Sequence, residues 1–342
     1  MSCASTGRRR PAAALWASFL GACPMSATPF AQEAPADYPR VAAAAQAYDA
    51  GDKDRAVEML RAFCREQPDD GVRPLRCAEL LIQRRQDAAR GEEFSRRGLE
   101  RMPELPQAWL LHGAALLFNQ KADEAEALFR DATARFPQDV DLLFSLGMAC
   151  VMNQKNLEAQ QHLRAALQRK PDQPLFLFTL GENCVRLHRL DEAEVLLRRA
   201  AELRPPHPDA LGRLADVLAL RGRPGEAEAC FRRALETGPA GARLKAALQY
   251  AIFLVDQRRS EEALPHLVRV TEKKADDRVA WHYLARCLQK LGRKEEAAVA
   301  VARYRDLQQR VDRAEDTFLL GLIAEQLRVG KKEDGAADGG AR

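Results

Sequence analysis

The sequence predicts an all-α protein, a solenoid of about eight helix-turn-helix repeats, and two observations carry that prediction. First, small residues and prolines recur with a 34-residue period between Pro106 and Gly241. Second, each block holds two segments with apolar residues at helical i, i+3/i+4 spacing. A period of this length decides the architecture, because each unit can bury its apolar face only against its neighbours. The columns that define the period are Gly113, Gly147, Gly181, Ala215; Ala125, Ala159, Ala193, Ala227; and Pro137, Pro171, Pro205, Pro239.

The columns have a physical meaning within one block. Gly113 on the first segment and Ala125 on the second mark a close crossing of two helices, where a larger side chain would push them apart. Pro137 closes the block because proline cannot continue a helix and restricts the residue before it. One block contains, in order, Trp109, His112, Gly113, Leu116, Ala125, Phe129, Ala132 and Pro137. This series resembles the tetratricopeptide repeat (TPR), with histidine where leucine is usual.

The resemblance implies antiparallel helix pairs stacked into a right-handed TPR superhelical solenoid with a concave groove. Repeats are predicted over residues 37–309, and Trp281, Ala285 and Ala297 hold the register of the last one. Pro265 falls near the start of a second helix, where a kink or a later helix start is tolerable. The predicted repeats are 37–70, 72–105, 106–139, 140–173, 174–207, 208–241, 244–277 and 278–309.

Both ends of the chain differ from the repeats. Residues 310–329 predict an amphipathic capping helix, which would cover the last apolar face, and residues 330–342 are rich in Gly and Ala and predicted to be disordered. Residues 1–22 resemble a signal peptide: three arginines precede an apolar run too short to span a bilayer. The run ends at Cys23 in a sequence that resembles the bacterial lipobox, in which the cysteine is lipidated, and residues 23–36 would then be a flexible tether.

This N-terminus leaves alternatives open. A plain secretory signal cut nearer Ala31 would discard Cys23, and a chain that is not exported would use neither. The main expectation is an exported protein, periplasmic or attached to the outer membrane by an N-terminal lipid only. We expect no nucleic-acid partner, because 53 basic and 49 acidic residues are mixed and no basic stripe with interleaved aromatics occurs.

No catalytic, metal or cofactor site is predicted. There is no Cys-x2-Cys pair, no His-x3-His motif and no Gly-rich phosphate loop. Cys184 and His188 stand four residues apart and could pair as thiol and imidazole, but no third group accompanies them. Cys64 and Cys77 fall on neighbouring helices, either as a disulfide or as two buried thiols.

The TPR resemblance implies that one stripe on each first helix lines the concave groove. In the middle repeats this stripe is apolar and contains methionines, which repack around varied ligands. It lacks the basic and amide residues of TPR proteins that clamp chaperone carboxylates. The alternative is that tight winding or a self-dimer buries the stripe. The predicted groove residues are Leu110, Phe118, Phe144, Met148, Met152, Phe178, Glu182 and Arg186.

The favoured function is therefore a non-enzymatic scaffold or adaptor of the bacterial envelope that binds a protein or peptide partner. The alternative is a structural, self-associating (homo-oligomerising) protein. The two differ in an observable way, because an adaptor purified alone should be a monomer with an open groove.

Overall fold

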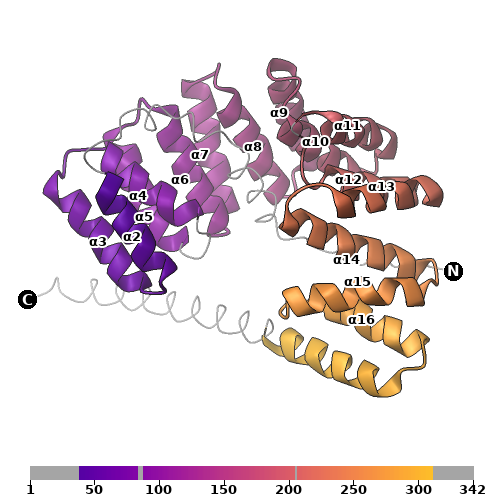
Figure 1. The fold of residues 1–342 in the computed structure, drawn as a ribbon. Helices are drawn as coiled ribbons and strands as arrows, with labels where there is room; N and C mark the ends of the chain where they lie inside the picture. The colour runs from indigo at the N-terminus through magenta and orange to yellow at the C-terminus, as the bar shows by residue number, and fades with distance from the viewer. Residues whose placement is uncertain (1–37, 84–87, 205, 311–342) are drawn as a thin grey trace, which may run out of the picture. The chain divides into compact units, whose positions relative to one another are not determined.

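The computed structural model describes residues 38–83, 88–204 and 206–310, and all its regular elements over these residues are helices (Figure 1). Short turns join the helices in pairs, which confirms the predicted α-solenoid of helix-turn-helix repeats. The helices are α2 Tyr38–Asp49, α3 Lys53–Glu66, α4 Val72–Gln83, α5 Ala88–Arg101, α6 Pro106–Phe118, α7 Ala122–Arg135, α8 Val140–Met152, α9 Asn156–Arg169, α10 Pro174–Arg186, α11 Leu190–Glu202, α12 Ala210–Leu220, α13 Pro224–Glu236, α14 Ala240–Asp256, α15 Ser260–Lys273, α16 Arg278–Lys290 and a helix over residues 294–310.

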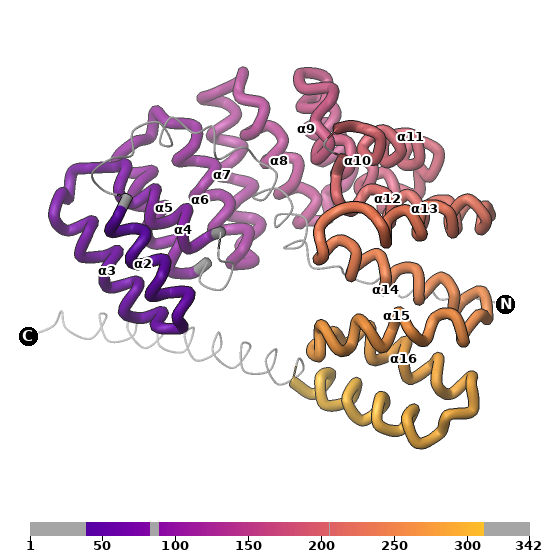
Figure 2. Tube along the Cα trace, viewed as in Figure 1, coloured from indigo at the N-terminus to yellow at the C-terminus, as the bar shows by residue number. Residues whose placement is uncertain are grey.

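The chain divides into two compact units, one ending at Ala210 and one beginning at Leu211. Figure 2 traces the backbone of both units, coloured by residue number. In the first unit α2 packs on α3, α4 on α5, α6 on α7, α8 on α9 and α10 on α11. First helices of consecutive repeats also pack together: α4 contacts α6, and α6 contacts α8. In the second unit α14 packs against α13, α15 and α16.

The glycine column lies at the helix crossings. A Cβ atom added at Gly113 would lie 2.1 Å from the Phe129 ring, and one at Gly147 would lie 2.9 Å from the Leu163 side chain. Gly181 faces Leu197 in the same way, at 2.9 Å. The side chain of the second helix therefore occupies the space that a larger residue on the first helix would need.

The turn between the two helices of a repeat contains one residue in the left-handed region. Gln120, Gln154 and His188 have φ values of 62°, 62° and 57°, and Gly222 at the same register has 73°. Arg258, between α14 and α15, also has a φ of 62°. Only glycine adopts this conformation without steric cost, so these four non-glycine turns are strained.

Polar contacts link several second helices to the turn of the next repeat. Lys121 Nζ lies 2.7 Å from Glu92, and one repeat later Lys155 Nζ lies 2.7 Å from Glu126. At the same register Gln160 takes the place of the glutamate and accepts a hydrogen bond from Arg189 Nη1 at 2.6 Å.

Glu126 is the most buried acid of this series, with a side chain only 3% exposed. Burial by itself would raise the pKa of Glu126, but hydrogen bonds from Lys155, Asn153 and Arg130 outweigh it and lower the pKa to about 2. The carboxylate is thus held in its charged form inside a repeat-to-repeat contact.

Two local expectations change. The helix α14 begins at Ala240 and has 17 residues, so it starts before the predicted start of its repeat at residue 244 and includes the two inserted residues between the predicted repeats 208–241 and 244–277. Pro265 lies inside α15, which begins at Ser260, so the helix neither starts late nor ends there. The Glu261 carbonyl that loses its partner at Pro265 belongs to an exposed residue, so water can satisfy it.

None of the described helices has both the length and the apolar content that crossing a bilayer requires. The predicted signal peptide, Cys23, the predicted tether, Pro205, nearly all of the predicted capping helix and the predicted C-terminal tail lie outside the described residues.

Candidate partner-binding site

The eight predicted groove residues lie on α6, α8 and α10, the first helices of three consecutive repeats. They differ in accessibility: one group is buried, a second is half-buried, and one residue is exposed. The buried group is Phe144, Met148, Phe178 and Glu182; the half-buried group is Leu110, Phe118 and Met152; the exposed residue is Arg186.

The expectation that the aromatic ladder faces solvent is wrong. Phe144 is 0% exposed and Phe178 is 3% exposed. The Phe144 ring stacks on Phe176 of α10 with ring centres 4.3 Å apart, and the Phe178 ring stacks on His207 at 3.9 Å. Side chains of the following helix and loop fill the stripe, so these two phenylalanines are core residues, as the buried alternative supposed.

Apart from the half-buried Leu110, the accessible part of the predicted stripe is its edge. Phe118, Met152 and Arg186 are the last residues of α6, α8 and α10, and they occupy the same register position. In the second unit this position is Leu220, the last residue of α12, which is 65% exposed. Leu220 was absent from the predicted site, although the 34-residue period identifies it.

Cys184 and His188, which the sequence spacing alone would allow to pair, differ in burial. Cys184 is fully buried, and burial raises the pKa of its thiol to about 11. His188 is exposed and lies beyond the end of α10, in the left-handed turn. A protonated, buried thiol is a poor nucleophile, so this pair offers no catalytic chemistry.

The remaining described cysteines are also buried, and none of them forms a disulfide with another described cysteine. Cys64 on α3 and Cys77 on α4 place their sulfur atoms 3.7 Å apart, so both thiols lie in one packed contact between neighbouring helices.

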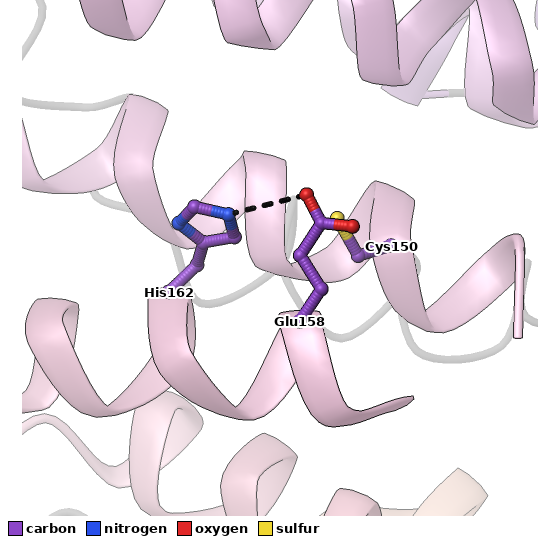
Figure 3. A group of neighbouring side chains, drawn as sticks. All are labelled: Cys150, Glu158 and His162. Carbon is purple, nitrogen blue, oxygen red and sulfur yellow. Dashed lines mark ion pairs between the residues drawn. The ribbon is translucent and has the colours of Figure 1, made fainter. Parts of the chain in front are cut away.

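One group of described side chains could hold a metal ion. Cys150 of α8 and Glu158 and His162 of α9 place one potential ligand atom each within 4.8 Å of one another (Figure 3). The motif search missed this group because its members come from two helices and include only one cysteine and one histidine.

Two protein-family models match this chain, and both describe the tetratricopeptide repeat. One model matches residues 151–206 and 185–249, and the other matches residues 110–174 and 251–310. Together the matches cover more than half of the 342-residue chain. No curated protein sequence shows significant similarity to this chain.

Solved structures with a similar fold share little sequence. Yeast Tom70 matches with a TM-score of 0.60 and 16% identity, over 82% of this chain and 62% of that chain. The Cut9–Hcn1 hetero-tetramer of the APC/C matches with a TM-score of 0.58 and 15% identity, over 72% of this chain and 48% of that chain. The human IFIT1 dimer with PPP-AAAA matches with a TM-score of 0.51 and 16% identity, over 75% of this chain and 68% of that chain. The chain thus spans about half to two thirds of the length of these structures.

Proposed function

Since this chain is a tetratricopeptide-repeat protein, we propose that it is a non-enzymatic adaptor of the bacterial envelope that binds an apolar peptide segment or helix of a partner protein. The observation that carries this proposal is the edge formed by Phe118 and Met152. Both side chains are half-buried, both end a first helix, and the two helices α6 and α8 pack against each other. Accessible apolar side chains that lie together on a surface usually mark an interaction site.

The chemistry of the edge indicates the kind of partner. Phe118 offers a flat apolar surface, and Met152 has a flexible, polarizable side chain that adapts to different shapes. Arg186 ends the next first helix and is exposed, so it can contact an acidic or polar group at the rim. A partner segment with apolar side chains on one face and an acidic residue beside them fits this edge best.

The charge distribution argues against a nucleic-acid ligand of the kind present in the human IFIT1 structure. Basic and acidic residues are nearly balanced over the chain. On the described surface many arginines pair with carboxylates, as Arg164 does with Glu192 at 2.5 Å and Arg199 with Asp172 at 2.6 Å. Paired arginines have less to gain from phosphate contacts, which supply most non-specific nucleic-acid affinity.

Partner binding is tested with a photo-reactive amino acid placed at residue 118, 152 or 157 in cells that express the chain. Leu157 is the matched control because it is 63% exposed but lies on the second helix α9. We expect crosslinks from 118 and 152 to one partner and none from 157. Crosslinks of equal yield at all three sites would contradict the proposal.

Substitution gives the affinity. Phe118→Ala and Met152→Ala should each weaken binding of the crosslinked partner by several-fold to tenfold, because a buried large side chain contributes about 1.5–3 kcal/mol and these are half-buried already. Leu157→Ala should leave binding unchanged. If the two edge variants instead shift a monomer–dimer equilibrium in sedimentation, the self-associating alternative replaces the adaptor.

The envelope location is a separate part of the proposal and is tested separately. We propose that Cys23 is lipidated after removal of residues 1–22. In a Gram-negative host the chain should then fractionate with membranes and incorporate a fatty-acid analogue, and Cys23→Ser should abolish both. Periplasmic recovery without label would leave only the plain secretory signal, and cytoplasmic recovery of the uncut chain would contradict export.

A further inference from the structure

The fourth repeat contains a group of three different metal-ligating side chains that face one another. Cys150 lies on α8, and Glu158 and His162 lie four residues apart on α9, so the last two share one face of their helix (Figure 3). Their potential ligand atoms all lie within 4.8 Å of one another. Thiolate, carboxylate and imidazole are the three ligand types that Zn²⁺ takes in proteins. We propose that Cys150, Glu158 and His162 form a Zn²⁺ site that cross-links the two helices of this repeat.

The geometry needs only small side-chain movements. Tetrahedral Zn²⁺ with bonds of about 2.0–2.3 Å holds its ligand atoms roughly 3.5 Å apart, so the group must close by about an ångström. The Glu158 and His162 side chains are 37% and 26% exposed, and His162 Nε2 already lies 3.8 Å from Glu158 Oε1. Cys150 is fully buried and fixes the inner end of the site, while the solvent side can supply a water as the fourth ligand.

The neighbouring charges are compatible with a cation. Arg130 Nη2 lies 2.9 Å from Glu158 Oε1, and no hydrogen bond or ion pair of the described residues engages the other carboxylate oxygen, Oε2. Two carboxylates, Glu126 and Glu158, and two cations, Arg130 and Lys155, surround the Cys150 thiol. A divalent cation at the site would therefore have carboxylate charge beside it. On binding, the ion takes the place of the thiol proton, which passes to solvent.

The repeats supply natural controls at the same three register positions. The fifth repeat has Cys184 and Glu192 but Leu196 in place of the histidine. The seventh has Glu262 and His266 but Leu254 in place of the cysteine. Among the described repeats only the fourth has all three ligands. Leucine already occupies the histidine position in the fifth repeat and the cysteine position in the seventh, so the fold accepts leucine at both positions.

Metal binding is tested on the full reduced chain with Co²⁺, which reports tetrahedral coordination and thiolate ligation by visible d–d bands and a near-ultraviolet charge-transfer band. We expect one Co²⁺ per chain, displaced by Zn²⁺. His162→Leu reproduces the fifth repeat and should weaken binding by more than tenfold, since changes outside the ligand shell already cost about 10–100-fold. Cys150→Ala should abolish the charge-transfer band. Cys184→Ala, the same change one repeat later, should retain it.

Thermal stability and metal stoichiometry give further tests of the Zn²⁺ site. Circular dichroism without metal shows that a variant is folded, and its melting temperature with Zn²⁺ is then compared with that without. Zn²⁺ should raise the melting temperature of the wild type and not that of His162→Leu. Absence of both bands in the wild type, or equal Co²⁺ affinity in His162→Leu, would overturn the site. A Leu196→His variant should bind two ions; a stoichiometry that stays at one would show that these three side chains do not suffice.

Discussion

The first and second helices of the middle repeats are buried in different ways. Helix α10 is buried without a break from Leu175 to Cys184, whereas its partner α11 buries a single stripe of Ala193, Glu194, Leu197 and Ala200. Helices α8 and α9 show the same contrast. A second helix keeps one face in water, while a first helix also contacts the neighbouring repeats. The difference teaches that apolar periodicity identifies a packing face only where the opposite face stays polar.

Truncation of a first-helix aromatic should give the largest effect. Phe144→Ala is expected to cost about 3–5 kcal/mol of unfolding free energy, as large as Phe129→Ala, because both rings are fully buried. Urea denaturation followed by circular dichroism measures the loss. Leu157→Ala, on the wet face of α9, should stay within about 0.5 kcal/mol of the wild type. A Phe144→Ala variant that unfolds with the wild-type midpoint would contradict the burial of Phe144 and support its place in an open groove.

Filling the crossing between the two helices should come next. Gly147→Leu is expected to destabilise by about 1–3 kcal/mol or more, because the new side chain must displace Leu163, whose backbone nitrogen lies 3.3 Å from the added Cβ position. Gly225→Leu is the matched control, since a Cβ at this helical glycine meets no atom within 4 Å. Equal melting temperatures for the two variants would contradict the assigned crossing.

Acid should weaken the second-helix contact at Glu126. The pKa of this carboxyl is lowered in the folded state, so its contribution is fully present above about pH 4.5 and is lost as pH falls towards 2. The loss is on the order of 2–3 kcal/mol. Urea titrations from pH 6 to pH 2 measure it.

Glu126→Gln copies the residue that Gln160 supplies one repeat later, so it should fold. Its stability should fall less steeply between pH 4.5 and 2 than that of the wild type. Parallel pH profiles for the two chains would show that Glu126 is not the group responsible.

The turns between the helices should give the smallest effect, and it is a gain. Gln154→Gly removes the steric cost of a left-handed residue and is expected to stabilise by about 0.5–1 kcal/mol, as a net of this relief and the entropy of glycine. Gln161→Gly, in the middle of α9, should instead destabilise by about 0.5–1 kcal/mol. Thermal melting that ranks both variants below the wild type would argue against strain at the turn.

Much of the fold was predictable because it depends on short-range patterns. The period set the order of the helix pairs, and the small residues at Gly113, Gly147 and Gly181 identified the crossings. The start of α14 was not predicted, because an insertion that extends a helix and one that lengthens a loop look the same in sequence.

The candidate site was predicted only in part. Phe118 and Met152 are half-buried, whereas Phe144 and Phe178 are covered by Phe176 and His207. Aromatic side chains on a helix give the same sequence signal whether they meet solvent, a partner or the next repeat.

The sequence by itself determined the repeat, its period and the pairing of helices within it, because those depend on residues fewer than 34 positions apart along one chain. Only the tertiary structure decided which first-helix side chains stay accessible and that Cys150, Glu158 and His162 meet. The physical reason is that burial and ligand geometry depend on how two helices are rotated and spaced against each other. Packing of whole side chains sets that rotation, and the spacing of residue types along the chain does not record it.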